Sequence, residues 1–246
     1  MRVSGLYAYP VKSCAAVALE EATLDGLGLA QDRRFAFVGK DGGALTQRDQ
    51  PLLAVIKPRL EAGELRLDCG GILDLSVPLE AFGGNTIGVQ VWEKHLAGKA
   101  AAASLIEKAC DFLGSEVSLV ALERGSACDF ADSEPVLVTT QETLSFLNRQ
   151  LASPVGMERF RPNVVLEGAQ AQDELRWRAL RGNELQLDCA RACARCEVTT
   201  IDQSSGARRG DEPLRTLNER FAGNFGVYCR VVRAGPLRLG EALQPS

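Results

Sequence analysis

Residues 189–201 read Cys-Ala-Arg-Ala-Cys-Ala-Arg-Cys-Glu-Val-Thr-Thr-Ile, and the rest of the chain is best interpreted outward from this stretch. Three cysteines, Cys189, Cys193 and Cys196, and two arginines stand directly before a β-branched run, 198–201, that predicts a strand. A cysteine beside fixed positive charge is stabilised as a thiolate, which is both the nucleophile and the metal ligand. The stretch therefore predicts a metal cage, a redox pair or one working sulfur with supporting neighbours.

The spacing of the cysteines leaves these alternatives open. A structural zinc site needs about four ligands, so the three cysteines need a distant partner such as Cys229. A thioredoxin-like pair needs its Cys-x-x-Cys motif where a strand meets a helix, whereas a β-like run follows here. The plainest interpretation is a set of small buried residues in a loop.

The composition is that of an ordinary globular protein. Of 246 residues, 46% are apolar and 24% are charged, and the net charge is −4, which is typical of a soluble protein of one or two domains. No basic excess or polybasic segment indicates nucleic acid or a membrane, so we expect neither as a partner. Eight cysteines without an apolar leader predict reduced thiols in a cytoplasmic protein.

Short strands and glycine-rich turns dominate the first half of the chain. Candidate strands recur at 3–9, 17–24, 34–38, 44–47, 52–60, 65–69, 72–77 and 86–92. Many short strands of this kind predict a closed or partly closed barrel, which leaves few exposed edges. A helix is expected over 100–113, and another after Thr140, where Thr-Gln-Glu follows Thr139 in a capping-box pattern.

The polar stretch 123–134 is the best candidate linker in the chain. Shorter strands and a few helices follow it, with no internal repeat. We therefore expect a mainly β protein with some helices, built from two β-barrel-like domains at 1–122 and 128–246.

Three fragments outside the cysteine stretch add positive charge beside predicted strands. They are Lys12-Ser13, Asp32-Arg33-Arg34-Phe35 and Arg159-Phe160-Arg161-Pro162-Asn163. Alone, each is most simply a solvated surface charge. Arginine also suits bidentate recognition of phosphate. Combined with Arg191 and Arg195 beside the thiols, the fragments predict a site for an anionic cofactor that carries a metal.

Taken in order, the fragments resemble a known family. The matching blocks are Tyr9-Pro10-Val11-Lys12-Ser13-Cys14, Gly28-Leu29 with Asp32-Arg33-Arg34-Phe35, Thr46-Gln47-Arg48 with Pro51, Phe160-Arg161-Pro162-Asn163-Val164-Val165, Cys193-Ala194-Arg195-Cys196 continuing through Thr199-Thr200-Ile201-Asp202 to Gly206, Phe225-Gly226-Val227-Tyr228, and 235–241. The chain resembles MOSC-domain proteins with an N-terminal MOSC β-barrel domain, the group that contains the mitochondrial amidoxime-reducing component and related bacterial molybdenum-cofactor proteins. The ordered set is much more specific than any single block.

The resemblance implies a molybdenum–molybdopterin cofactor whose metal is held by Cys196, the second cysteine of the Cys-x-Arg-Cys motif and the implied catalytic residue. The implied cofactor contacts are Lys12, Ser13, Arg34, Arg161, Asn163, Arg195, Cys196 and Tyr228. A soft thiolate for a transition metal and cations for an anion agree with this assignment.

The implied activity is that of a molybdenum-dependent oxidoreductase. Small N-hydroxylated compounds, such as hydroxylamines, amidoximes or N-hydroxylated bases, lose oxygen at the metal, and a separate ferredoxin-like or flavoprotein donor supplies electrons. Two alternatives remain: a non-redox carrier of the cofactor or of persulfide sulfur on Cys196, and a zinc-stapled module that uses all three cysteines.

Overall fold

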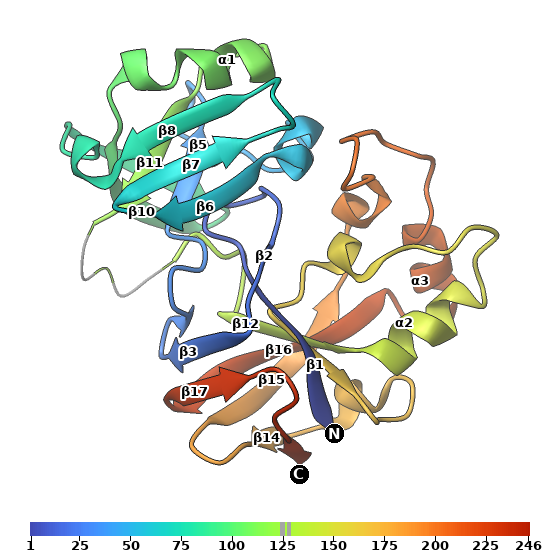
Figure 1. Cartoon of the computed structure of the whole chain (residues 1–246). Coiled ribbons are helices and arrows are strands. Elements are labelled where there is room, and N and C mark those ends of the chain that lie inside the picture. Colours follow the sequence, from blue (N-terminus) through green and yellow to red (C-terminus); the bar gives the residue numbers. More distant parts are fainter. Residues whose placement is uncertain (124–125, 127–128) are drawn as a thin grey trace.

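Two β units make up the molecule, one above the other in Figure 1. The computed structural model describes residues 1–123, 126 and 129–246. The upper unit contains a four-stranded sheet, β5-β11-β10-β9, and a three-stranded sheet, β6-β7-β8. The lower unit contains an eight-stranded sheet, β18-β14-β15-β16-β12-β13-β1-β2, and a three-stranded sheet, β17-β3-β4.

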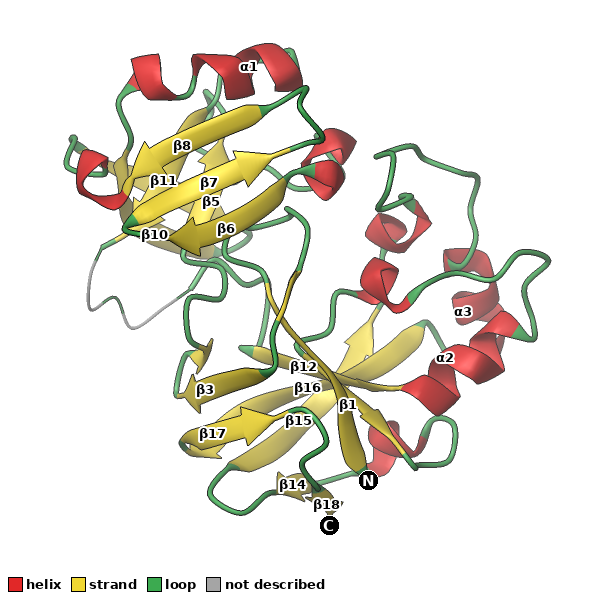
Figure 2. Ribbon diagram, in the orientation of Figure 1, coloured by secondary structure: helices red, strands yellow, loops and turns green. Residues whose placement is uncertain are grey.

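In the upper unit, antiparallel strands enclose a core, and one helix lies over its top (Figure 2). The elements are β5 (Phe35–Val38), β6 (Lys57–Glu61), β7 (Glu64–Asp68), β8 (Asp74–Pro78), β9 (Thr86–Val91), β10 (Lys94–Ala100), α1 (Glu107–Leu113) and β11 (Ser118–Leu122), with short 3-10 helices at Pro51–Val55, Leu79–Ala81 and Ala103–Leu105. Gly114 ends α1 with a φ of 63°, a left-handed conformation that glycine adopts at little cost.

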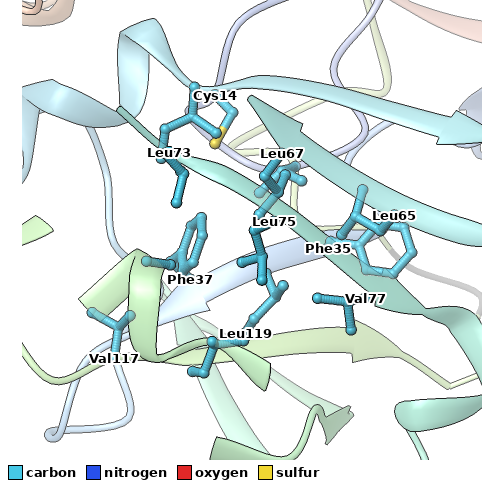
Figure 3. Close-up of a cluster of buried hydrophobic side chains, with 14 of the residues drawn as sticks. Cys14, Phe35, Phe37, Leu65, Leu67, Leu73, Leu75, Val77, Val117 and Leu119 are labelled. Atoms are coloured by element: carbon cyan, nitrogen blue, oxygen red, sulfur yellow. The ribbon is translucent and has the colours of Figure 1, made fainter. Parts of the chain in front are cut away.

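The core of the upper unit is built by alternation along the strands. Leu65 and Leu67 of β7 and Leu75 and Val77 of β8 all point into it (Figure 3), since successive strand side chains face opposite sides. Each such side chain, when fully buried, stabilises the fold by roughly 1.5–3 kcal/mol. Cys14 lies in the same core at 0% exposure, so the chain just after Lys12 and Ser13 is anchored against the upper unit.

The lower unit combines the largest sheet with two helices on one side (Figure 1). Its elements are β1 (Arg2–Ala8), β2 (Val17–Ala18), β3 (Glu21–Asp25), β4 (Gly28–Leu29), β12 (Val136–Thr140), α2 (Gln141–Asn148), β13 (Val164–Glu167), β14 (Ala179–Arg181), β15 (Gln186–Ala194), α3 (Leu214–Arg220), β16 (Asn224–Arg233), β17 (Gly235–Arg238) and β18 (Gln244–Pro245), with 3-10 helices at Met157–Phe160, Asp173–Arg176 and Glu197–Thr200. The side chain of Thr140 accepts a hydrogen bond from the Thr143 amide and caps α2.

The first four strands belong to the lower unit although they begin the chain. β1 pairs antiparallel with β13, with Leu6 opposite Val164, and β3 pairs antiparallel with β17, with Ala22 opposite Leu237. The chain therefore passes from the lower unit to the upper unit after β4 and returns at β12. Residues 30–34 lie on the first of these crossings. Residues 9–14, between β1 and β2, also reach the upper unit, where Val11 bridges to Phe35.

The expected fold class, mainly β with some helices in two barrel-like units, is confirmed. Two expected strands are wrong, and a third, at 52–60, is wrong in its first half, because the 3-10 helix Pro51–Val55 comes first and β6 begins only at Lys57. At 44–47 only an isolated bridge forms between Val38 and Ala44, and a turn follows. At 198–201 the chain forms the 3-10 helix Glu197–Thr200, because the hydroxyls of Thr199 and Thr200 donate to backbone carbonyls three residues earlier.

The expected helix at 100–113 is shorter than the sequence indicates, because β10 continues through Ala100 and α1 begins only at Glu107. The expected linker, 123–134, includes residues 124–125 and 127–128, which lie outside the described residues. The domain limits 1–122 and 128–246 stay a prediction. No helix in the described ranges is long and apolar enough to cross a bilayer.

Candidate functional site

A cavity of about 280 Å³ opens where the two units meet. The charged side chains among its described lining residues are six cations, Lys12, Arg33, Arg48, Arg161, Arg191 and Arg195, and two carboxylates, Asp132 and Glu134. Low-dielectric walls focus the field of such charges. The excess of positive charge favours an anionic guest.

The structure brings seven of the eight predicted site residues to this cavity: Lys12, Ser13, Arg161, Asn163, Arg195, Cys196 and Tyr228. Arg34 is the exception. It lines a separate groove with Phe35 and Leu122, and its Nη2 donates to the Glu123 carbonyl at 3.4 Å. Arg33 lies in the turn before β5 with a left-handed φ of 48°. It takes the position in the cavity that the resemblance implied for Arg34.

Arg33 and Arg161 lie over the buried ring of Tyr9, with guanidinium carbons 4.9 Å and 4.3 Å from its centroid. Such contacts are cation–π interactions, and they are strongest when desolvated. Burial lowers the pKa of Lys12, and the charges of Arg33 and Arg161 act in the same direction. We call Tyr9, Lys12, Arg33 and Arg161 the Tyr9 cluster.

Every cation of the Tyr9 cluster has a fixed oxygen partner. Lys12 Nζ donates to the Phe130 carbonyl at 2.9 Å and pairs with Asp132, Arg33 pairs with buried Asp32, and Arg161 Nη1 donates to the Cys14 carbonyl at 2.7 Å. Buried charge is tolerated only with partners of this kind. The cluster is thus a prebuilt part of the cavity wall.

Asp132 links the Tyr9 cluster to the mouth of the cavity. Burial opposes ionisation of its carboxyl, but the Lys12 ammonium and a hydrogen bond with Trp92 keep the pKa of Asp132 below its usual value. Its charge is therefore retained at neutral pH. The carboxylate is shared between the lysine and the indole.

Asn163 forms the floor of the cavity and ties three strands together. Its Nδ2 donates to the Tyr7 carbonyl at 3.2 Å, and its Oδ1 accepts from the Leu137 amide at 3.1 Å. Arg33 Nη1 also donates to this oxygen at 3.4 Å. Because the amide is engaged with the backbone on both sides, Asn163 holds the floor in place.

A second group of residues surrounds the thiols, and we call Arg48, Arg195, Cys193 and Cys196 the sulfur cluster. Arg48 Nη2 donates to Cys196 Sγ at 3.0 Å, and Arg195 Nη1 donates to Cys193 Sγ at 2.8 Å. Arg195 Nη2 reaches the Phe160 carbonyl at 2.9 Å, whereas its buried Nε has no hydrogen-bond partner among the described residues. An unpaired buried donor costs about 1–3 kcal/mol, so this nitrogen fits an acceptor supplied by a guest.

The local fold explains how Cys196 reaches the cavity. The pairing of β15 with β16 shifts register between Cys189 and Arg191 and again between Ala192 and Ala194, and such irregularities redirect side chains. The strand ends at Ala194, and half-buried Cys196 precedes the next 3-10 helix. Its Sγ therefore lies at the cavity wall.

The three cysteines of the stretch separate in space. Cys189 packs in the lower core, where its Sγ is 3.6 Å from Cys229 Sγ, and Cys193 is buried beside Tyr228. Burial, together with Cys193, raises the pKa of Tyr228 above its usual value. Within the described part of the chain no three His, Cys, Asp or Glu side chains are placed to hold a metal. The geometry thus favours one working sulfur over a three-cysteine cage.

Sequence reasoning missed several residues of the cavity, chiefly Arg48 and Trp92. The guanidinium carbon of Arg48 lies 4.8 Å from the Trp92 ring centroid. Buried Gln47 positions this loop by donating to the Ser13 carbonyl at 2.7 Å and by exchanging hydrogen bonds with Gln203. Arg48 stood in a family-like block, which was the available signal. Trp92 reaches the site through the fold, which brings the β9–β10 turn to the cavity.

Comparison with known proteins places these features in a family. Residues 1–116 match the model of the MOSC N-terminal beta barrel domain, and residues 126–244 match that of the MOSC domain. The chain belongs to the MOSC-domain proteins with an N-terminal MOSC β-barrel domain. The resemblance drawn from the ordered sequence blocks is thereby confirmed.

Relatives of this MOSC-domain protein are similar over nearly its whole length. It is 27% identical to mitochondrial amidoxime reducing component 2 of Bos taurus and 28% identical to mitochondrial amidoxime-reducing component 1 of Homo sapiens, in each case over 97% of this chain and 81% of the relative. The solved structure of the YUAD protein from Bacillus subtilis aligns with a TM-score of 0.49 and 14% identity, over 98% of this chain and 93% of that chain.

Proposed function

We propose that this MOSC-domain protein binds a molybdenum–molybdopterin cofactor in the cavity between its units and reduces N-hydroxylated compounds there. The observation that carries the proposal is a single thiol, that of Cys196, at the wall of a cavity lined by six cations. The names of the relatives, amidoxime-reducing components, support the same chemistry for this chain.

The residues present fit such a cofactor. Its anionic part meets Lys12, Arg33 and Arg161, whose charges are already fixed in the cavity wall. The unpaired buried Nε of Arg195 fits an additional acceptor. A soft thiolate ligand such as that of Cys196 suits a transition metal. Cys196 is therefore our assignment for the metal ligand, and Arg33 replaces Arg34 as a contact.

When bound, the cofactor supplies the two-electron chemistry that removes oxygen from an N–O bond. An N–OH substrate that takes up two electrons and two protons leaves as N–H and water. The protein binds and orients the reactants and excludes water from the cavity. Tyr228, whose pKa is raised by burial, keeps its hydroxyl proton at neutral pH and so lines the site as a neutral group that can donate a hydrogen bond.

A separate protein supplies the electrons in this proposal. A ferredoxin-like or flavoprotein donor docks near the cavity and delivers them one or two at a time. The sequence alone led us to expect a cytoplasmic protein, whereas the named relatives are mitochondrial. The location stays a prediction.

Metal and pterin analysis tests the proposal. The wild type and the variants Cys196→Ser and Cys193→Ser are purified from cells that make the cofactor, and molybdenum, zinc and pterin are measured beside reduction of a hydroxylamine with an artificial donor. We expect molybdenum and activity in the wild type, both lost in Cys196→Ser and retained at least in part in Cys193→Ser.

Two other outcomes identify the alternatives. One equivalent of zinc without pterin contradicts the proposal and identifies a structural metal site. Molybdenum and pterin bound without turnover of any N-hydroxylated compound identify a carrier that uses Cys196 for the cofactor or for persulfide sulfur.

A further inference from the structure

Cys189 is a cysteine of the stretch 189–201 to which the proposed function gives no role. Its Sγ accepts a hydrogen bond from the thiol of Cys229, with the two sulfurs 3.6 Å apart. The two residues are separated by 40 positions in the sequence, and the pairing of β15 with β16 places them directly opposite each other. The contact between the thiols is therefore a product of strand pairing.

The same pairing gives the two backbones a separation that suits a disulfide. The Cys189 amide donates to the Arg178 carbonyl at 2.8 Å, on the side of β14, and so points away from β16. Opposed residues that exchange no ladder hydrogen bonds have Cα atoms about 4.5 Å apart. Disulfides span Cα separations of about 4.4–6.8 Å. The two sulfurs can therefore be joined without a large movement of either strand.

The two thiols differ in exposure and in acidity. Cys189 is half-buried and packs against the lower core, whereas Cys229 is 0% exposed within that core. The hydrogen bond from Cys229 lowers the pKa of Cys189, and the same contact together with burial raises the pKa of Cys229 well above its ordinary value. The thiolate is the reactive form of cysteine. A small oxidant from solvent therefore meets Cys189 first, while Cys229 keeps its proton.

Cys110 provides a comparison elsewhere in the molecule. It is half-buried like Cys189, but its Sγ contacts the Val117 carbonyl, at 3.7 Å. Among the residues that the structure describes, no second pair of thiols shares a hydrogen bond. Partial exposure is thus common to Cys189 and Cys110, whereas a thiol partner belongs to Cys189.

We propose that Cys189 and Cys229 are a redox-active dithiol, in which a hydroperoxide oxidises Cys189 and Cys229 then closes a disulfide between β15 and β16. This modification site lies outside the cavity and does not depend on the proposed function.

The reaction proceeds in two steps. The Cys189 sulfur attacks a peroxide oxygen, so that an S–O bond forms, the O–O bond breaks, and the leaving hydroxide takes up a proton to become water. The Cys229 sulfur then attacks the Cys189 sulfur, an S–S bond forms, and the hydroxyl leaves with the Cys229 proton as a second water. The two sulfurs together lose two electrons, which the peroxide gains.

The position of the disulfide connects it to the cavity wall. The strand pairing shifts register between Cys189 and Arg191, and directly after the shift Arg191 lies opposite Tyr228. Both residues line the cavity, with the guanidinium carbon 5.2 Å from the ring centroid. A covalent link at Cys189 fixes the strand pairing beside this part of the wall.

Peptide mapping of the wild-type protein under non-reducing conditions tests the proposal. Trypsin leaves Cys189 and Cys229 on separate peptides, 182–191 and 221–230. The protein is reduced, freed of reductant and treated with a small excess of hydrogen peroxide. We expect these two peptides to be joined within monomeric chains and to be separated again by dithiothreitol, which does not reverse sulfinic acid. The peptide with Cys110 is the control and is expected to stay outside any disulfide.

Two variants test the order of the steps. In Cys229→Ala the sulfenic acid of Cys189 has no thiol to resolve it, so dimedone is expected to label Cys189 in this variant and not in the wild type. In Cys189→Ala the buried Cys229 is expected to stay unmodified. Labelling of Cys229 in Cys189→Ala overturns the assignment of Cys189 as the reacting thiol.

The wild type alone decides whether the dithiol exists, so a variant that fails to fold leaves the test intact. If peroxide leaves both peptides unmodified, or converts Cys189 to sulfinic acid without joining it to 221–230, the two cysteines are packing residues and the proposal is overturned. Either result leaves the assignment of Cys196 to the metal unaffected.

Discussion

The Tyr9 cluster and the sulfur cluster differ in what their cations contact. Lys12, Arg33 and Arg161 each have an oxygen partner from a carboxylate or a backbone carbonyl. Arg48 and Arg195 each donate to a sulfur, at 3.0 Å and 2.8 Å, and Arg195 also donates to the Phe160 carbonyl. Oxygen partners hold a fixed charge or dipole, whereas a thiol changes its charge when it loses a proton or binds a metal. The Tyr9 cluster therefore forms a fixed part of the cavity wall, whereas the charge of the sulfur cluster changes when a guest binds.

The largest effect is expected from Asp32→Ala, which removes the buried partner of Arg33. Asp32 is 2% exposed and also accepts the Tyr9 amide at 2.6 Å. An uncompensated buried guanidinium costs about 3–5 kcal/mol, so urea unfolding is expected to show a loss of that size. Glu116→Gln, in the exposed pair with Lys40, serves as a control without measurable change. If Asp32→Ala is as stable as the wild type, the Tyr9 cluster does not stabilise the cavity wall.

The next effect separates binding from stability in the sulfur cluster. Arg195→Met removes two hydrogen bonds but also removes a buried donor without a partner, so the cofactor-free protein is expected to keep its unfolding free energy within about 1 kcal/mol. Molybdenum and pterin content are expected to fall about tenfold, because a charge-assisted contact to the guest is lost. Arg215→Met, on exposed α3, is the control. If Arg195→Met loses as much unfolding free energy as Asp32→Ala, the two clusters do not differ in their contribution to stability.

A smaller effect on stability is expected only at acid pH and concerns the turn that begins at Asp202. Hydrogen bonds from Ser204 and Ser205, with the charge of Arg209, hold the pKa of Asp202 at about 2 although burial opposes them. A carboxyl with a folded-state pKa below its unfolded value of about 3.9 stabilises the protein above that value. The contribution is lost as pH falls from about 4 to about 2.

Unfolding of the wild type and Asp202→Asn, followed from pH 7 down to pH 2, checks this expectation. The wild type is expected to be more stable at pH 7, and the difference is expected to shrink only below about pH 4. A difference that stays constant through this window shows that the charge of Asp202 has no part in holding the turn.

The smallest effect contrasts two thiols, that of Cys14 in the core of the upper unit and that of Cys196 in the sulfur cluster. Cys14 is 0% exposed, and burial raises its pKa to about 12 even though Arg161 opposes the shift. Half-buried Cys196 lines the cavity. Iodoacetamide at pH 8, followed by peptide mass spectrometry, is expected to label Cys196 in the native cofactor-free protein and to leave Cys14 unlabelled until denaturant is added. Rapid native labelling of Cys14 contradicts the closed core of the upper unit.

Local patterns along the chain predicted much of this fold. The patterns in residues 65–69 and 72–77 located β7 and β8, and the capping-box pattern from Thr139 to Glu142 located the start of α2 to within one residue. One failure has a clear physical cause. The strand expected at 198–201 became a 3-10 helix because the threonine hydroxyls bond locally to the backbone. Such competition cannot be decided by β propensity alone.

The candidate site was predictable where charge and sulfur are clustered in the sequence. Lys12, Arg161 and Cys196 all reach the cavity. Which of two adjacent arginines faces the cavity depends on the turn before β5, and the structure brings Arg33 there while Arg34 lines a separate groove. The position of Trp92 at the cavity depends on the packing of one unit against the other.

The pairing of β3 with β17, near the other end of the sequence, sets an order of events during synthesis. Ala22 opposes Leu237, so β3 waits for a partner made about 210 residues later, which takes roughly 10 to 40 seconds on a ribosome. The strands of the upper unit need no such delay, since their partners all lie between Phe35 and Leu122. The upper unit can fold on the nascent chain, whereas the cavity closes only once translation is nearly complete. A guest of this cavity can therefore bind only after translation.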